Sequence, residues 1–381
     1  MKNISWIKKL IYTLICIAFI LVTYNLQVLA SEEELLVEHY EQAVVIKDFG
    51  IKSIENSAGF TGAEQMLEVE FISGPYKGNK IMVANGLSGM EGMDINVQEG
   101  SKVVICYFED QNTTFPDNIQ QAYVSDVVRT GYLKLLVFIF ALLMVLIGAR
   151  QGIKALLALS LTILCLYKIL LPALMKGYSP LPITILILSM VTIITMLLVA
   201  GFTRKALAAT LGTIGGVIIA GLLAYLGGDL ASLYGLSTEE ERMLLFVENI
   251  KIDTRGLLFA GILIGAIGAI MDVTISVASA LEEVKKANPD LSSWQLIQSA
   301  MRVGNDIMGT MANTLILAYV GGGLPFLILF TAYDFTAIRI LNSELIATEI
   351  VRAMAGSIGL VISVPLTALA GGVLNYHKKL D

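Results

Sequence analysis

The sequence predicts a membrane α-helical bundle with an N-terminal extracytoplasmic small β-barrel domain of the OB type. The first observation is composition: 56% of the 381 residues are hydrophobic and 15% are charged, against about 45–50% and about 25% in soluble domains. The second is an uneven charge. Residues 31–130 carry 6 basic and 17 acidic side chains, a balance of −11, whereas 131–381 carry 17 basic and 15 acidic. An acidic lobe therefore precedes a nearly neutral body that contacts the lipid bilayer. This composition excludes a soluble enzyme, a disordered chain and a disulfide scaffold. The sequence also has no basic patch of the kind that binds nucleic acid.

Residues 1–30 have the features of a targeting segment. Lys2, Lys8 and Lys9 precede the apolar run 10–22, and Val28-Leu29-Ala30 stands before Ser31. A basic region, a short apolar region and a Val-x-Ala end are typical of a signal peptide. The stretch 10–30 is also about long enough to span a bilayer as a signal anchor. Both alternatives place residue 31 outside the cytoplasm.

Residues 31–130 are expected to form a β domain. Leu67, Val69 and Phe71 alternate with two glutamates, which is the period of a half-buried strand, and the turn residues 73–78 follow. Similar patterns predict about five short strands, at 42–49, 67–71, 80–84, 103–108 and 120–128. A small antiparallel barrel of the OB type fits this number of strands.

The segment 131–381 is expected to cross the membrane about seven times. Its apolar runs, each near the ~20 residues that span a bilayer, are 132–149, 153–174, 181–201, 206–226, 256–280, 304–323 and 353–375. The connections that carry lysine and arginine all fall on one side, which predicts that this side and the C-terminus are cytoplasmic. The Glu239–Glu241 loop falls on the outer side.

One segment, 324–341, is ambiguous. Gly321 to Pro325 breaks a helix, and an apolar stretch follows before Asp334. The segment is the outer end of a span, a re-entrant piece or an interfacial helix. If it crossed the membrane, Lys378 and Lys379 would lie outside, against the positive-inside rule. We therefore place it on the outer side.

The connector between the runs 256–280 and 304–323 is predicted to be cytoplasmic. Ser292 or Ser293 is a plausible N-cap there for an amphipathic surface helix that carries Trp294 and Leu296.

Motifs of soluble enzymes are absent from the sequence. There is no phosphate-binding Gly-x-x-x-x-Gly-Lys loop, and Ala355 to Gly359 is one residue short of a nucleophile elbow. His39 and His377 are predicted on opposite sides of the membrane. We expect no enzyme activity, no metal site and no cofactor.

Polar residues inside three apolar runs are candidates for function. In the run 256–280, spacings of three and four place a set of small and polar residues on one helical face: Gly261, Gly265, Gly268, Asp272, Ser276 and Ser279. Asp306, Thr310 and Asn313 share a face of the next run, and Gly356, Ser363, Thr367 and Gly371 form a third stripe. Three such stripes favour a polar bundle interior.

Each of these residues also has a structural interpretation. Small and hydroxyl residues in membrane helices commonly serve close packing, and Asp306 fits an interfacial or capping role. Asp272 is harder to explain in this way, because an acid in hydrocarbon costs about 2.5–3.5 kcal/mol on insertion scales. An acid inside a span is therefore a functional-site hypothesis, with a proton or cation as the obvious ligand.

The sequence resembles the YibE/F family of bacterial membrane proteins. The residues that carry the resemblance are Gly268–Ser276, Asn288-Pro289 and Gly304–Tyr319, together with the turn Ser73–Gly78 of the β domain. It implies a multi-pass protein of the bacterial plasma membrane and says little about activity. Asn305 stands where the family pattern has arginine, which puts a charge-pair role there in doubt. A weaker similarity, in the order of polar and glycine motifs, is to the SecF half of the proton-driven SecDF export machinery.

The leading hypothesis is an ion- or proton-coupled transport-like protein. Its pathway residues are Asp272, Ser276, Ser279, Asp306, Thr310 and Asn313. The alternative is a structural or accessory protein whose outer β domain binds an envelope partner, either a protein or a small molecule, with the helices as an anchor.

Overall fold

The structure is a computed structural model that describes residues 38–55, 61–90, 92, 94–109, 119–247 and 252–374. The predicted signal peptide or anchor at 1–30 lies outside these residues. The described chain forms two compact units, one that ends at Leu143 and one that begins at Met144.

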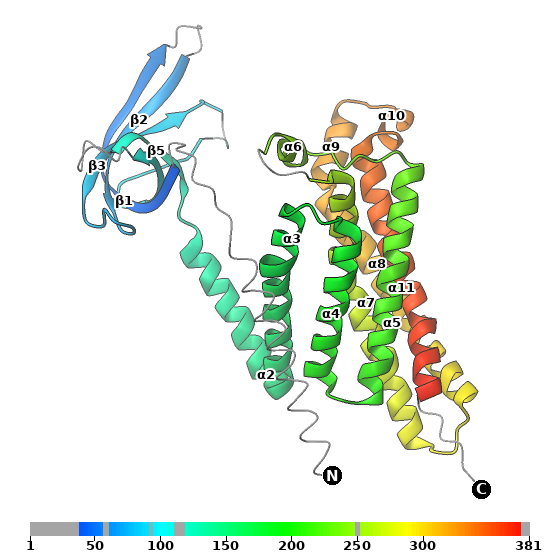
Figure 1. Cartoon of the computed structure of the whole chain (residues 1–381). Helices are drawn as coiled ribbons and strands as arrows, with labels where there is room; N and C mark the ends of the chain where they lie inside the picture. The colour runs from blue at the N-terminus through cyan, green and yellow to red at the C-terminus, as the bar shows by residue number, and fades with distance from the viewer. Residues whose placement is uncertain are drawn as a thin grey trace. The chain divides into compact units, whose positions relative to one another are not determined.

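The first unit contains a closed β-barrel of five strands (Figure 1). They are β1 (Glu38–Glu55), β2 (Thr61–Phe71), β3 (Lys80–Leu87), β4 (Lys102–Glu109) and β5 (Ile119–Val127). The order around the barrel is β1-β2-β3-β5-β4; β3 and β5 pair in parallel, and the other neighbours are antiparallel. The prediction of a small five-stranded barrel is confirmed.

Alternating apolar residues fill the barrel. Leu67, Val69 and Phe71 of β2 are buried, as the alternation in the sequence predicted, and they pack with Val103 and Ile105 of β4. The 18-residue strand β1 pairs with β2 on one side and β4 on the other. Two register shifts in β1 provide the local bends that such a strand needs to close a barrel.

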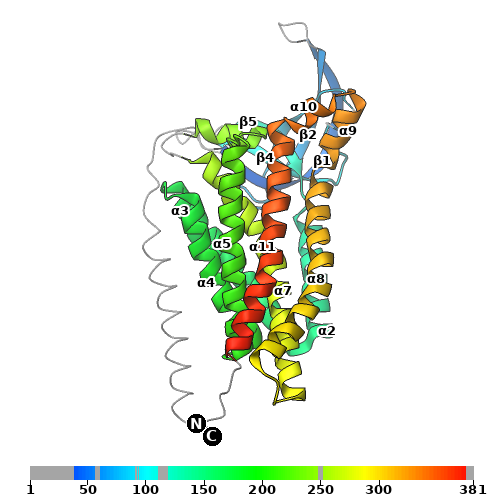
Figure 2. The same cartoon turned by 90° about the vertical axis from the view of Figure 1, so that its right-hand side faces the viewer.

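A helical segment follows the barrel. Its helices are α2 (Thr130–Cys165), the π-helical turn η1 (Leu166–Leu170), α3 (Leu171–Met175), α4 (Pro180–Ala200), α5 (Arg204–Leu230), α6 (Glu239–Met243), the short 3-10 helix η2 (Leu244–Phe246), α7 (Thr254–Ala287), α8 (Ser293–Gly322), α9 (Leu324–Ala332), α10 (Ala337–Leu341) and α11 (Glu344–Leu374). Figures 1 and 2 show α4, α5, α7, α8 and α11 side by side with their axes roughly aligned. Among the described residues, five helical segments are long and apolar enough to cross a membrane, or six with the bent pair α8–α9.

The first of these segments, Thr130–Met175, is 46 residues long. A straight helix of this length measures about 69 Å at 1.5 Å per residue, twice the ~30 Å of a bilayer core. The backbone is not helical at Ala149, and a Cβ on Gly152 would lie 1.8 Å from the carbonyl oxygen of Met144. Eight residues of straight helix separate two positions by about 12 Å, so the chain folds back at Ala149. Only glycine permits this approach at position 152.

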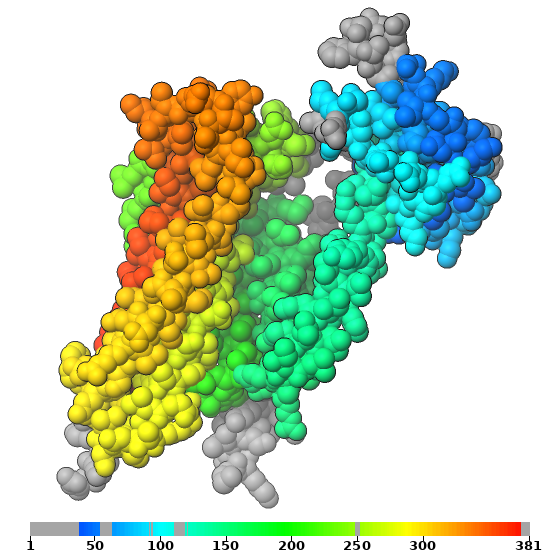
Figure 3. All heavy atoms as spheres, turned by 180° about the vertical axis from the view of Figure 1, so that it is seen from behind, coloured from blue at the N-terminus to red at the C-terminus, as the bar shows by residue number. Residues whose placement is uncertain are grey.

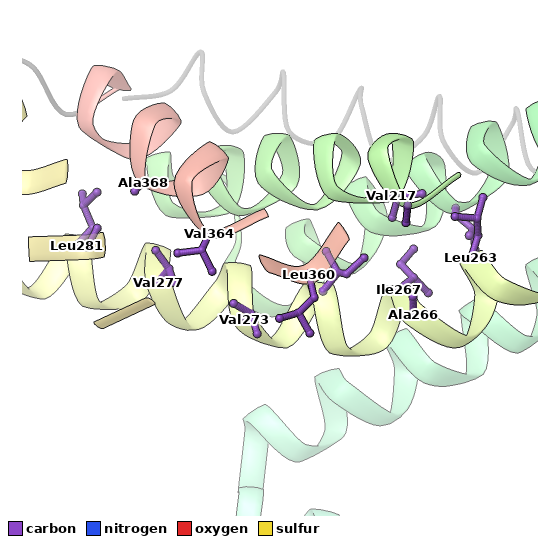
Figure 4. Close-up of a cluster of buried hydrophobic side chains, with 14 of the residues drawn as sticks. Val217, Leu263, Ala266, Ile267, Val273, Val277, Leu281, Leu360, Val364 and Ala368 are labelled. Atoms are coloured by element: carbon purple, nitrogen blue, oxygen red, sulfur yellow. The ribbon is translucent and has the colours of Figure 1, made fainter. Parts of the chain in front are cut away.

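The interior of the second unit is apolar (Figure 4). Val273, Val277 and Leu281 of α7 pack against Leu360 and Val364 of α11, and side chains of α5 and α8 complete the cluster. Small residues bring α5 and α11 close together. A Cβ on Gly216 would lie 2.8 Å from both the Gly359 carbonyl oxygen and the Ser363 Cβ.

The segment 324–341 turns back at the end of α8. Helix α9 is bent by 56° from α8 at Gly323, and α10 follows before α11 begins. The carboxylate of Glu344, at the start of α11, accepts hydrogen bonds from backbone N–H groups that follow α5. The ends of α5 and α8 and the start of α11 therefore lie at one end of the bundle, together with α6, α9 and α10 (Figure 1).

The expectation of a separate surface helix before the run 304–323 is wrong. Ser292 is an N-cap, and it forms a capping box with Gln295, but the helix that it starts continues without a break to Gly322. No proline or other strong breaker interrupts the sequence between Trp294 and Gly304, so helical hydrogen bonding extends through both parts.

Candidate functional site

The small and polar face of α7 points away from the apolar core. Gly261, Gly268 and Asp272 are exposed, and Ser276 and Ser279 are partly exposed, whereas Ile270 and Val273 on the other side are fully buried. A Cβ on Gly261 or Gly268 would meet no atom within 4 Å. Gly268, one turn from Asp272, thus leaves open space beside this carboxylate.

Asp272 lies near the middle of its span. At one end of the bundle, Lys205 of α5 and Glu282 of α7 form an ion pair with an N–O distance of 3.9 Å. We call the height of this ion pair along the bundle axis the charged level. Ten residues of α7 separate Glu282 from Asp272, or about 15 Å of helix. This is half of the ~30 Å hydrocarbon thickness. No other residue that the structure describes forms a hydrogen bond or an ion pair with Asp272.

The polar face of α8 is also directed outward. Asp306, Thr310 and Asn313 are exposed, whereas Gly304 and Leu315 on the opposite side are buried. The Thr310 hydroxyl donates to the carbonyl oxygen of Ile307 in its own helix, at 2.8 Å. Figure 3 shows that α8 runs along one surface of the bundle with no other helix of this unit over it. This helix is therefore amphipathic within a span.

The two polar faces lie at the same depth on neighbouring helices. A Cβ on Gly304 would lie 3.3 Å from Val277 Cγ2, and a Cβ on Gly265 would lie 2.5 Å from the Tyr319 hydroxyl. These two contacts fix an antiparallel register between α7 and α8. By interpolation, Asp272 stands at about the level of Thr310, with Ser276 near the level of Asp306. The predicted pathway residues therefore lie at similar heights on two adjacent helices. No hydrogen bond between described residues joins the polar residues of α7 to those of α8.

The expectation of a polar bundle interior is wrong for α7 and α8. Their interior faces carry leucine, isoleucine, valine and methionine, which fill the space against α5 and α11. The third stripe, on α11, is buried. Its Ser363 and Thr367 pack against glycines of α5, and a Cβ on Gly212 would lie 1.8 Å from the Thr367 hydroxyl oxygen, whereas Gly356 contacts α7 and α8. This stripe serves close helix packing.

One buried polar contact crosses the core. The hydroxyls of Thr213 on α5 and Thr274 on α7 are 2.7 Å apart, and both residues are fully buried. No local pattern predicts this pair, because the two threonines lie 61 positions apart.

Sequence reasoning missed a second polar group, nearer the end of the bundle that carries α6. Arg352 Nη1 donates to a Glu349 carboxylate oxygen at 2.7 Å, and both side chains are more than two-thirds covered. The Tyr319 hydroxyl lies near this pair, in contact with Gly265, and is buried with no hydrogen-bond partner among the residues that the structure describes. The predicted span began at residue 353, just after this pair. A glutamate and an arginine three residues apart at the edge of an apolar run were the sequence signal that could have revealed the ion pair.

No group of three histidine, cysteine, aspartate or glutamate side chains is arranged to hold a metal ion in the described part of the chain.

The fold defines a multi-pass helical membrane protein whose first span follows a small β-barrel, and whose α7 and α8 carry a polar outward surface at mid-depth. The chain belongs to the YibE/F-like protein family, whose sequence model matches residues 136–377. The family resemblance predicted from the sequence is thus confirmed. The match begins after the barrel, and it lends no support to the similarity with SecF. Neither the curated proteins nor the solved structures contain a match to this chain.

Proposed function

We propose that this protein is a proton- or cation-coupled transport-like protein in which Asp272 binds the coupling ion. The observation that carries the proposal is the position of this carboxylate, about 15 Å from the charged level of Glu282, with no lysine or arginine paired to it among the described residues. An acid at this depth costs about 2.5–3.5 kcal/mol when the helix inserts. A function that needs the carboxylate accounts for this cost, and helix packing does not.

Neighbouring oxygen atoms support the same role. Ser276 lies one turn from Asp272 on α7, and Thr310 stands at its level on α8, with Asp306 and Asn313 one turn away on either side. Carboxylate, hydroxyl and amide oxygens are the donors that hard cations prefer, and a carboxylate also accepts a proton. Ser279, two turns from Asp272, lies at the end of this set that is nearer Glu282. Its hydroxyl donates to the Ile275 carbonyl oxygen at 2.6 Å.

We further propose an orientation in which the basic end of the bundle is cytoplasmic and the barrel is outside the cell, in a bacterial plasma membrane. Lys205 of α5 and Lys285 and Lys286 of α7 lie at the basic end, and Glu239–Glu241 of α6 lie at the other, where Arg255 is paired with Asp229. No catalytic role is proposed for any residue.

Flux measurements on the full chain in proteoliposomes test the role of Asp272. A pH-sensitive dye is enclosed, and a potassium diffusion potential or a sodium gradient is imposed. Wild-type protein should move protons or sodium, and Asp272→Asn should abolish the flux while the protein stays in the membrane. Glu283→Gln is the matched control, because it removes one carboxylate from the same helix at the charged end, where Glu283 pairs with Lys286. Unchanged flux in Asp272→Asn, or no flux in the wild type, would contradict the proposal.

A second candidate function is partner binding by the barrel. Strand β1 exposes Tyr40, Phe49 and Ile51, at 54%, 54% and 65% of their surfaces. Exposed apolar side chains on one strand favour contact with another molecule outside the cell. Phe49→Ser with Ile51→Ser should then remove crosslinks between the full chain and envelope components in cells, and unchanged crosslinks would exclude this role.

A further inference from the structure

The outward surface of α8 contains a regular polar stripe that lipid cannot satisfy. Arg302, Asp306, Gly309 and Asn313 follow each other at spacings of four, three and four, and all four are exposed. This is the spacing of a seam between two paired helices. Aspartate and asparagine facing hydrocarbon are unfavourable, so this part of the stripe requires a polar covering. Arg302 lies one turn from Asp306, towards the charged end of the bundle.

Within the part of the chain that the structure describes, no helix covers the stripe. The apolar stretches 10–22 and 135–147 hold no charged or amide side chain. Helices α5, α7 and α11 pack on the opposite, apolar side of α8 or behind it. A second chain can supply the covering that the described residues do not provide.

The stripe is complementary to itself. In two parallel copies of α8 related by a two-fold axis, Arg302 of each copy lies about 6 Å along the axis from Asp306 of the other, a distance that the long arginine side chain can reach. Among the described residues, neither forms an ion pair within its own chain. Asn313 carries both a donor and an acceptor, so two copies can pair across the axis. A Cβ on Gly309 would meet no atom within 4 Å, which leaves room for a close helix at the centre of the stripe.

We propose that two copies of this chain pair in the membrane through the α8 stripe formed by Arg302, Asp306, Gly309 and Asn313. The pairing covers the polar face of one span with the same face of another. It leaves Asp272 outside the contact, on the neighbouring helix, but it includes Asp306 and Asn313 of the proposed ion-binding set. The pairing is therefore tested by co-purification and crosslinking, whose results do not depend on flux.

Co-purification of differently tagged copies that carry charge-reversal substitutions tests the pairing. Copies with Arg302→Asp carry only acids in the stripe, and copies with Asp306→Arg carry only bases. Each variant should co-purify with its own copies roughly tenfold less than the wild type does. In a symmetric pair, each substitution removes both Arg302–Asp306 contacts and places like charges next to each other. When the two variants are expressed together, they should pair with each other as well as the wild type does. Self-pairing at the wild-type level, or no recovery in the mixture, would overturn the proposal.

Cysteine crosslinking provides a second test that does not alter the charges. In a chain with Cys16, Cys106 and Cys165 replaced by alanine, Gly309→Cys should form a covalent dimer on mild oxidation in membranes. Leu369→Cys, at an exposed apolar position of α11, is the control and should stay monomeric. Absence of the Gly309→Cys dimer overturns the proposal. So does reaction of this cysteine with a charged, membrane-impermeant thiol reagent in place of crosslinking, since that result indicates water and not a second chain.

Discussion

At Gly359 the backbones of α5 and α11 approach each other so closely that no side chain fits between them. A Cβ there would lie 2.7 Å from both the Ala220 Cβ and the Gly216 carbonyl oxygen. Membrane helices gain no hydrophobic energy from leaving lipid, so their association depends on such close packing. This contact holds together two of the central helices of the bundle.

We expect Gly359→Ala to destabilise the protein by about 1–3 kcal/mol, because the added methyl group forces the two helices apart. The measurement is the unfolding free energy of the full chain in mixed micelles. Gly227→Ala on α5 is the matched control, since its Cβ would meet Val351 at an ordinary 3.5 Å. Equal stability of the two variants would show that the close approach is not needed.

Because of Tyr107, the barrel is expected to lose stability at alkaline pH. Burial, and then the nearby carboxylates of Glu41 and Glu109, raise the pKa of Tyr107 from 10.0 to about 12. Its buried hydroxyl has no hydrogen-bond partner in the described part of the barrel. Because the folded barrel holds this proton more tightly than the unfolded chain does, the contribution to stability is complete below about pH 10 and is lost as the pH rises towards about 12.

Thermal unfolding of the barrel in the full chain, followed by β-sheet circular dichroism from about pH 9 to about pH 11.5, measures this effect. The wild type should lose stability more steeply than Tyr107→Phe, which has no phenol to ionise. Parallel curves for the two proteins would assign the alkaline sensitivity to other groups.

At the scale of the element, Glu344 connects the start of α11 to the loop after α5. Its carboxylate accepts hydrogen bonds from the N–H groups of Tyr234 and Gly235 at 2.8 and 3.0 Å, and from Leu236 at 3.5 Å. Hydrogen bonds to a charged group contribute about 1.5–3 kcal/mol each. One side chain therefore orders the connection between two helices that are distant in sequence.

Glu344→Ala should lower the hydrogen-exchange protection of residues 234–236 by at least about tenfold, with little change in the middle of α5. Glu240→Ala, on the neighbouring helix α6, removes the same group from an exposed position and should leave this protection unchanged. A loss of protection in both variants would indicate that the loop responds to charge in general.

Helix α8 shows how far the sequence predicts an element. The polar spacing placed Asp306, Thr310 and Asn313 on one face, and the sequence predicted an N-cap at Ser292 or Ser293, of which the structure has Ser292. The direction of that face was not predictable, because small polar stripes occur both in bundle interiors and on outward surfaces. The apolar volume supplied by α5, α7 and α11 decides which side of α8 is buried.

At the scale of the whole molecule, the charge distribution sets the orientation in the membrane. Lys205, Lys285 and Lys286 lie at one end of the bundle and Glu239–Glu241 at the other. Cytoplasmic loops of membrane proteins carry an excess of lysine and arginine. We therefore expect the basic end to remain inside the cell.

Single cysteines in a chain without its native cysteines measure this orientation. Glu240→Cys should react with a membrane-impermeant maleimide in intact cells, whereas Asp290→Cys, in the loop between α7 and α8, should react only after the cells are permeabilised. The reverse pattern would place the barrel in the cytoplasm and would also remove the extracytoplasmic role proposed for it.

By itself the sequence determined the class of this protein and most of its elements. Alternation at 67–71 predicted a strand, long apolar runs predicted spans, and Gly321 to Pro325 predicted a break where the structure has a 56° bend. These signals are local, because they depend on the spacing of apolar residues along one segment and on backbone preferences of glycine and proline.

Only the tertiary structure decided where the polar faces point. Asp272 was recognisable as an acid inside a span, yet its outward direction and its level beside Thr310 depend on how α7 packs against α5, α8 and α11. The pairing of Thr213 with Thr274 is likewise a property of two helices in contact. Helical periodicity specifies which residues share a face, whereas packing against distant segments specifies what that face meets.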